Sequence, residues 1–284
     1  MPILPFTYFD LQPIFDLLLN HRGQDISSFN LTYLNQTISK QLQLNQISEL
    51  SSYIAFLKRN DHALKILIEA IAINVSGFFR DPFSFMVFEK LILPALVEQN
   101  KSKKVSDLRI WSAGCATGEE VYSIVILINE LCRNSEIELP GYYLATDIKE
   151  DILTLARQGK YQPEKLKDTR LEFVTGYFEL KSNQYKLKSQ IRDRVYFEHH
   201  DLLDNNHRFP PHSVYGDFNL ILLRNVLYYY TPDTQANIFR RVTDALAKNG
   251  YLFIGESEMI HPDFTHLYNK CYDGAGIYQK RELK

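Results

Sequence analysis

The spacing of apolar residues changes once along this chain of 284 residues, and that change limits the folds open to it. Up to about residue 95, apolar side chains recur every three or four positions, which is the period of an amphipathic α-helix. From Leu108 onward, short apolar runs alternate with longer helical stretches. This pattern predicts two domains: one all helical, and one with a parallel sheet covered by helices on both faces.

The helical domain, residues 1–73, is expected to contain four short helices that pack together. Their apolar stripes are Leu11, Ile14, Phe15 and Leu18; Leu31, Leu34, Ile38 and Leu42; Ile47, Leu50, Ile54 and Leu57; and Leu64, Leu67, Ile68 and Ile71. Asn60 and Asp61 give a stop and a cap before the last helix. Residues 74–107 connect the two domains and contain one further helix, expected over residues 82–97.

The second domain, residues 108–284, is expected to have a Rossmann-like α/β fold with a mostly parallel sheet. Its predicted strands are residues 108–113, 142–147, 195–199, 219–223 and 251–254. Helices are expected at residues 119–132 and 148–158, and before the last strand. Residues 276–280 are expected to add an edge strand. The looser sequence at about 170–195 predicts a small β insertion with a turn at Ser182 and Asn183.

Composition excludes several classes of protein. The formal net charge of -2 gives no overall positive field that would draw the chain to nucleic acid or anionic lipid. The three cysteines (Cys115, Cys132 and Cys271) are too widely spaced for a zinc pair and too few for a disulfide framework, so we predict reduced thiols and no metal site. The start lacks the basic stretch of a signal peptide, and no apolar run is long enough to cross a membrane. We expect a cytoplasmic, monomeric protein without nucleic-acid binding or membrane insertion.

The junction after the first predicted strand is where a ligand is expected, because open α/β sheets bind ligands at the carboxyl ends of their strands. Gly114 and Gly118 let a ligand approach the backbone, and the helix start offers free N–H groups. A dinucleotide site would place phosphates there, but Glu119 and Glu120 would repel them. Carboxylates suit a cationic ligand without phosphate. S-adenosylmethionine is such a ligand, and a nicotinamide oxidoreductase is correspondingly disfavoured.

Polar residues also end the later strands. Asp147 ends the second strand, where its carboxylate is suited to bind both ribose hydroxyls, although an aspartate there can instead cap the next helix. Asp201 follows the third strand and is equally suited to accept from an adenine amino group or to form a turn. Arg224 and Asn225 end the fourth strand, which is apolar, and a charged residue there indicates a specific partner or ligand.

Five stretches, in the same order, resemble motifs of the CheR-type chemotaxis receptor methyltransferases. They are residues 73–82 (INVSGFFRDP), 111–123 (WSAGCATGEEVYS), 145–161 (ATDI, then LAR and GKY), 223–229 (LRNVLYY) and 250–258 (GYLFIGESE). The resemblance extends from about residue 20 to the end of the chain.

This resemblance implies a helical domain followed by a class I methyltransferase domain that uses S-adenosylmethionine and releases S-adenosylhomocysteine. The implied reaction is O-methylation of glutamate side chains on the cytoplasmic domain of methyl-accepting chemoreceptors. Carried over by position, and with Gly114 added from the glycine turn, the cofactor-binding residues are Asn74, Ser76, Arg80, Gly114, Glu120, Asp147, Asp201, Leu202, Arg224 and Asn225. Arg80 and Tyr229 match the residues closest to methyl transfer.

The chemistry of this reaction gives Arg80 a positioning role. A carboxylate is already a nucleophile at pH 7 and a sulfonium methyl is strongly electrophilic, so no general base is needed. The site must supply in-line approach and exclude water. An arginine can orient a carboxylate through a bidentate pair, so Arg80 is expected to position cofactor or substrate rather than to move a proton.

Three single residues depart from the family pattern. Ser76 replaces a threonine and keeps its hydroxyl, and Val121 replaces a proline that a first helical turn does not require. Asp201 replaces an asparagine, so the adenine contact loses an amide donor.

Two larger departures concern the docking of the receptor. The second helix offers only Lys40 where many relatives carry several arginines, and the insertion from Tyr177 to Tyr196 is too short to favour tethering of receptor tails. Two other functions therefore stay open. One is methylation of a small molecule or a non-receptor protein, and the other is a non-catalytic S-adenosylmethionine-binding scaffold in a signalling array.

Overall fold

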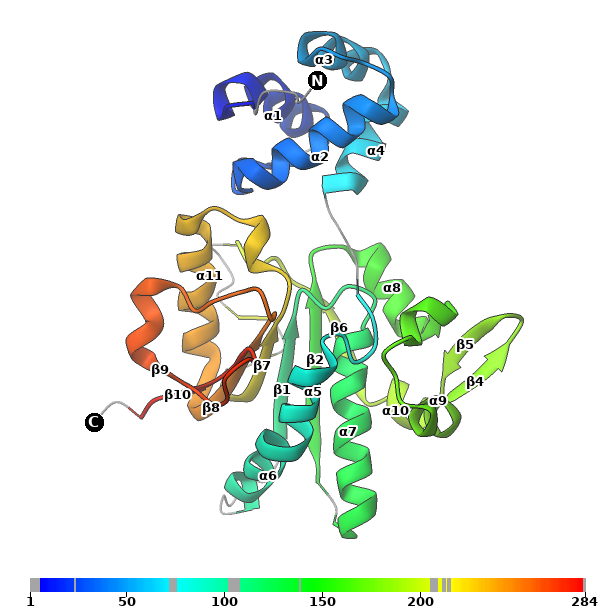
Figure 1. Cartoon of the computed structure of the whole chain (residues 1–284), viewed down its shortest axis with the longest axis vertical. Coiled ribbons are helices and arrows are strands. Elements are labelled where there is room, and N and C mark those ends of the chain that lie inside the picture. Colours follow the sequence, from blue (N-terminus) through cyan, green and yellow to red (C-terminus); the bar gives the residue numbers. More distant parts are fainter. Residues whose placement is uncertain are drawn as a thin grey trace. The chain divides into compact units, whose positions relative to one another are not determined.

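The computed structural model describes residues 6–22, 24–71, 76–101, 108–137, 139–204, 209–210, 213 and 216–282 (Figure 1). The chain divides into two compact units, Met1–Asn74 with Tyr228–Gln235, and Val75–Leu227 with Ala236–Lys284. The domain limits drawn from the sequence stay a proposal, and no sequence pattern indicated that residues 228–235 group with the helical unit. Within the described ranges, no helix is both long and apolar enough to span a membrane.

The first unit contains the four helices that the apolar periodicity predicts. They are α1 (Tyr8–Arg22), α2 (Leu31–Leu44), α3 (Leu50–Arg59) and α4 (Asp61–Ile71). Most of the predicted stripe residues form the core of this unit, and Leu31, Ile47, Leu50, Ile54 and Ile68 are partly buried against it. Asn30 caps α2, since its side chain accepts a hydrogen bond from the Tyr33 amide at 2.8 Å. Asn60 does the same for α4 by accepting from the Ala63 amide at 3.0 Å, which confirms the predicted cap.

The second unit is built around a seven-stranded sheet with the strand order β6-β2-β1-β7-β8-β10-β9. These strands are β1 (Leu108–Ala113), β2 (Gly141–Asp147), β6 (Val195–His199), β7 (Phe218–Leu223), β8 (Leu246–Ile254), β9 (Tyr268–Lys270) and β10 (Ile277–Lys280). The first five in the sheet order are parallel, and β10 and β9 pair antiparallel. The predicted mostly parallel sheet is confirmed. The strand predicted at 276–280 also forms, but the edge position was wrong because β9 pairs with its outer side.

The helices of this unit pack on the sheet and place its core along the central strands. They include α7 (Glu119–Ser135), which contacts β1 and β2, α8 (Glu150–Gln158), which contacts β2 and β6, and most of α11 (Pro232–Ala245). Trp111 of β1 is fully buried, and its Nε1 donates to Thr146 Oγ1 at 3.0 Å. This bond joins the ends of β1 and β2 from within the core.

The small β insertion is also confirmed, as a three-stranded antiparallel sheet with the order β3-β5-β4. Its elements are β3 (Lys160–Tyr161), η2 (Pro163–Leu166), α9 (Leu171–Tyr177), β4 (Phe178–Lys181), β5 (Gln184–Leu187) and α10 (Ser189–Arg192). Ser182 and Asn183 have positive φ values of 46° and 64°, as the two central residues of a type I′ hairpin turn require. Figure 1 shows β4 and β5 beside α9 and α10, away from the large sheet.

The single helix predicted over residues 82–97 is wrong in its middle. The segment consists of α5 (Pro82–Val87), a π-helical turn η1 (Phe88–Ile92) and α6 (Leu93–Lys101). The Leu93 amide donates to the Phe88 carbonyl, five residues earlier. Pro94 explains the wider turn: it has no N–H for the carbonyl of Lys90, and its ring would clash with that carbonyl in a regular helix.

Two short 3-10 turns complete the described chain. They are η3 (Leu227–Tyr229) and η4 (Pro262–Leu267).

Candidate active site

The glycine turn after β1 is held by the neighbouring strand end. The amides of Gly114 and Cys115 both donate to the Thr146 carbonyl at 2.9 Å, and Gly118 has a φ of 87° that favours glycine. A Cβ on Gly114 would lie 2.8 Å from Val226 Cγ2. The turn therefore packs closely on the segment that follows β7, as a site assembled from several strand ends requires.

Glu120 is the acid of the Glu119–Glu120 pair that faces this segment. One carboxylate oxygen accepts from Ser112 Oγ at 3.0 Å and the other lies 3.3 Å from Arg224 Nη1. Burial raises the pKa of Glu120, and the charge of Arg224 works against that rise. Glu120 is thus an acid held at a strand end by groups from β1 and from the end of β7.

Glu119 has a different role from the one the sequence suggested. Its side chain is fully buried, lies 3.1 Å from Lys165 Nζ and accepts from Thr117 Oγ1 at 2.8 Å. Its carboxylate therefore anchors the start of α7 to the insertion, and of the two adjacent acids only Glu120 lies beside Arg224.

Asp147 holds the glycine turn as well as its own strand end. Its Oδ2 accepts from the Ala116 amide at 3.0 Å and its Oδ1 from the Lys149 amide at 3.1 Å. Helix α8 begins only at Glu150, with Lys149 at the N-cap, so Asp147 is not the helix cap. Burial raises the pKa of Asp147, and the amide bonds work against that rise. Its ribose contact stays a prediction.

Asp201 forms the turn that the sequence analysis left open as an alternative. Its Oδ1 accepts from the Leu203 amide at 2.8 Å, and Leu202 between them is buried. The preceding His200 is buried beside the Trp111 ring, and its Nε2 has no hydrogen-bond partner within the described chain. Burial lowers the pKa of His200, which favours the neutral ring. Whether Asp201 also meets an adenine stays a prediction.

Arg224 is the centre of the site. Its side chain is 1% exposed, and its guanidinium carbon lies over the rings of Phe85 and Phe253, at 5.0 and 4.6 Å from their centroids. It bonds Asp81 Oδ2 at 2.7 Å, the Arg80 carbonyl at 2.9 Å and Glu120. Arg224 therefore joins the Arg80 segment to the glycine turn, and its contact with the cofactor stays a prediction. Asp81, which the sequence analysis did not single out, is its strongest ion-pair partner, and its place in the FFRD stretch was the available signal.

The segment around Arg80 has an unusual backbone. Phe79 and Asp81, on either side of half-buried Arg80, have φ values of 53° and 62°, in the left-handed region that bulky residues rarely adopt. The Phe79 amide donates to Ser123 Oγ at 3.0 Å, and the Ser76 carbonyl accepts from Lys165 Nζ at 2.7 Å. These bonds, with the ion pair to Asp81, hold the segment in its strained form. Asn74 lies outside the described residues.

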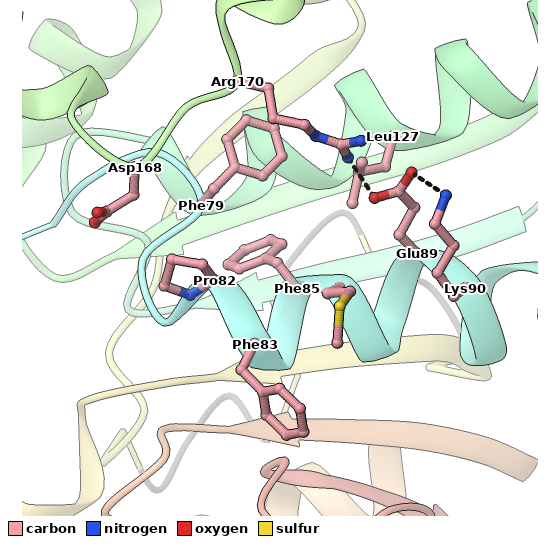
Figure 2. Close-up of a pocket in the computed structure, with 10 residues that line it drawn as sticks. Phe79, Pro82, Phe83, Phe85, Glu89, Lys90, Leu127, Asp168 and Arg170 are labelled. Atoms are coloured by element: carbon pink, nitrogen blue, oxygen red, sulfur yellow. Dashed lines mark hydrogen bonds and ion pairs between the residues drawn. The ribbon is translucent and has the colours of Figure 1, made fainter.

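A pocket of about 370 Å³ lies against the same segment (Figure 2). Its wall is mostly apolar and includes the rings of Phe79 and Phe85, and an ion pair joins Arg170 to Glu89 at its side. None of the described residues that are predicted to bind the cofactor lines it. The ring of Phe79 packs on Phe85 and on Phe173, at 5.5 and 5.3 Å between centroids, so the wall of this pocket also supports the strained segment.

Tyr229, predicted to lie near methyl transfer, belongs to the helical unit. Its ring lies 4.8 Å from that of Tyr33 and its carbonyl accepts from the Asn30 amide at 2.7 Å. Its catalytic role stays a prediction.

Comparison with known proteins identifies the family. Residues 74–274 match the CheR methyltransferase, SAM binding domain. A chemotaxis protein methyltransferase of Listeria innocua is 31% identical over 84% of this chain and 85% of its own length. Similar proteins of Borreliella burgdorferi and Pseudomonas aeruginosa, both named chemotaxis protein methyltransferases, are 29% identical over 88% and 89% of this chain and 88% and 91% of their own lengths. The chain belongs to the CheR methyltransferase family.

The described side chains of this CheR-family chain fit S-adenosylmethionine, its cofactor. Three carboxylates lie close together here. Those of Asp81 and Glu120 pair with the guanidinium of Arg224, and that of Glu258 binds the turn that follows Arg224. Such an arrangement suits a sulfonium and an ammonium and opposes phosphate groups. Asp147 lies at the neighbouring strand end, and each of its two oxygens accepts one backbone N–H, which leaves each a further acceptor site for the predicted ribose contact.

Affinity for S-adenosylmethionine is expected to fall as the pH is lowered, beginning at a higher pH than for ordinary carboxyls. Burial raises the pKa of both Glu120 and Asp147. Both residues belong to the predicted cofactor-binding set, in which their ionised forms would attract the cation and accept its hydrogen bonds. On that prediction, the affinity present above these pKa values is lost as the pH falls through them. Isothermal titration calorimetry from about pH 7.5 down to about pH 4 checks this. Asp147→Asn should make the dependence shallower, and a constant Kd over this range would contradict it.

Proposed function

We propose that this chain transfers the methyl group of S-adenosylmethionine to glutamate side chains of chemotaxis receptors and so forms glutamate methyl esters. Its membership of the CheR family supports this proposal. The observation that carries it is the bonding of Arg224, because one buried guanidinium joins the Arg80–Asp81 segment to Glu120. Three family motifs that are far apart in the sequence thus meet at the carboxyl ends of the strands, where α/β sheets bind ligands.

The proposed cofactor-binding set is the one carried over from the family motifs. Among its described members, Gly114, Glu120, Asp147, Arg224 and Asn225 lie at or directly after the ends of β1, β2 and β7, or at the start of α7. S-adenosylmethionine, when bound, supplies a methyl group on a positively charged sulfur. Arg80 is proposed to orient the substrate carboxylate, which is ionised at pH 7 and attacks without losing a proton.

The substrate assignment is tested by incubating the full chain with radiolabelled S-adenosylmethionine and a receptor cytoplasmic domain. The expected result is a label on receptor glutamates that mild base releases, since methyl esters hydrolyse in base. A receptor variant with the labelled glutamates replaced by alanine is the control. Binding of S-adenosylmethionine without any transfer would favour a scaffold, and a base-stable label would place the methyl group on another kind of side chain.

One observation favours a second candidate, methylation of a protein other than a receptor. Lys40 is the one basic residue of α2, so this helix offers little attraction to an acidic receptor surface. Offering a mixture of cytoplasmic proteins in the same labelling assay distinguishes the two candidates, because a receptor enzyme should label the receptor domain in preference to the mixture.

A further inference from the structure

The turn after β7 depends on one acidic side chain from the neighbouring strand. Asn225 has a φ of 59°, and its amide donates to Glu258 Oε2 at 2.8 Å. The amide of Leu227 donates to Glu258 Oε1 at 2.8 Å, and that of Gly255 donates to Oε2 at 2.7 Å. The carboxylate of Glu258 therefore holds the backbone on both sides of Val226.

The charge of Glu258 is stabilised by peptide groups rather than by an ion pair. The residue is 7% exposed, and within the described ranges no lysine, arginine or histidine forms a salt bridge with it. Three converging N–H groups act on a carboxylate as an anion-binding nest does on a bound anion. A neutral amide at this position would present an NH2 group to donors, and at least one buried N–H would lose its acceptor.

The close packing around the Glu258 carboxylate requires a glycine at position 255. A Cβ there would lie 2.7 Å from Glu258 Oε2, 2.8 Å from Asn225 Nδ2 and 3.1 Å from the Asn225 amide nitrogen. No side chain fits between the turn and the carboxylate. Gly255 and Glu258 thus pack together against the backbone of residues 225–227.

We infer that Glu258 is a positioning residue for the cofactor site. Its carboxylate binds the backbone of residues 225–227 and thereby fixes the position of Asn225. This inference rests on the proposed function, in which Asn225 contacts S-adenosylmethionine. Val226, at the middle of the turn, is also the side chain against which Gly114 packs, so the same carboxylate fixes the contact between the turn and the glycine loop. Loss of the Glu258 charge should therefore loosen both the position of Asn225 and the contact between Val226 and Gly114.

The test compares Glu258→Gln with Glu256→Gln in the full chain. Glu256 lies two residues earlier on the same turn with an exposed side chain, and is a matched control. Calorimetry with S-adenosylmethionine is expected to show a Kd about tenfold higher for Glu258→Gln and unchanged for Glu256→Gln. An unchanged Kd for a folded Glu258→Gln variant would overturn the inference. If the wild-type chain itself does not bind S-adenosylmethionine, the proposed function fails instead.

A double-mutant cycle separates positioning from a general structural role. In a background of Asn225→Ala, Glu258→Gln is expected to raise the Kd much less than it does alone, because its effect passes through Asn225. Equal effects in both backgrounds would overturn the inference. If Glu258→Gln does not fold, Glu258→Asp takes its place in the cycle: it keeps the charge but shortens the reach, and the same outcomes apply.

Discussion

Replacing Arg224 by alanine is expected to destabilise the methyltransferase unit by about 3–5 kcal/mol, because the change leaves buried charges without their partner. The Arg224 side chain is 1% exposed, and its guanidinium bonds the carboxylates of Asp81 and Glu120 and the carbonyl of Arg80. The side chains of Asp81 and Glu120 are themselves only 21% and 12% exposed, so water compensates little for the lost partner. Urea denaturation followed by fluorescence measures the effect. Trp111 is the single tryptophan of the chain and lies in β1, so the signal reports on this unit.

Two comparisons make the Arg224 result specific. Arg133 pairs with Glu130 at the surface and its side chain is 68% exposed, so Arg133→Ala should change stability by less than about 0.5 kcal/mol.

The loss of stability caused by Arg224→Ala should also shrink as the pH is lowered. Without the guanidinium the folded-state pKa of Glu120 rises further. The resulting destabilisation is complete above this raised folded-state pKa and is relieved as the pH falls from there towards the unfolded-state pKa. A variant as stable as the wild type at pH 7 would contradict the central role of Arg224.

The features that the sequence predicted correctly are those determined by local periodicity and by strand ends. The stripes from Leu11 to Ile71 specify helices because each stripe needs one buried face. The run at 108–113 followed by glycines and an apolar helix specifies a parallel strand and its crossover. Since the carboxyl ends of parallel strands meet at one edge, the neighbourhood of Glu120 and Arg224 followed from the same argument.

Other features depend on contacts that no local pattern encodes. Glu119 and Glu120 are adjacent, yet successive helical residues point about 100° apart, so one carboxylate meets Lys165 and the other Arg224. The sequence alone does not determine which of the two carboxylates meets Arg224. The positive φ of Phe79 and Asp81 is likewise imposed by tertiary contacts, and Pro94 was a local signal for the π-helical turn that the apolar periodicity concealed.

Arg80→Ala is expected to lower the rate of methyl transfer to a receptor domain by at least about a hundredfold while the chain stays folded. Arg80 is not a buried charge: it is half-buried, and its carbonyl, not its side chain, bonds Arg224. Removing the side chain therefore leaves the cluster around Arg224 intact. What is lost is the group proposed to hold the substrate carboxylate in line, and misplacement by about 1 Å is enough for such a loss.

The kinetic pattern distinguishes positioning by Arg80 from proton transfer. Since the attacking carboxylate carries no proton at neutral pH, the remaining activity of Arg80→Ala should follow the same pH profile as the wild type, whereas loss of a general base would change it. Arg80→Lys keeps the charge without the planar fork and should restore only part of the rate. Arg133→Ala, a surface arginine of the same unit, should transfer methyl groups normally. Full activity in Arg80→Ala would mean that the strained segment from Phe79 to Asp81 exists to hold the fold rather than to present this arginine.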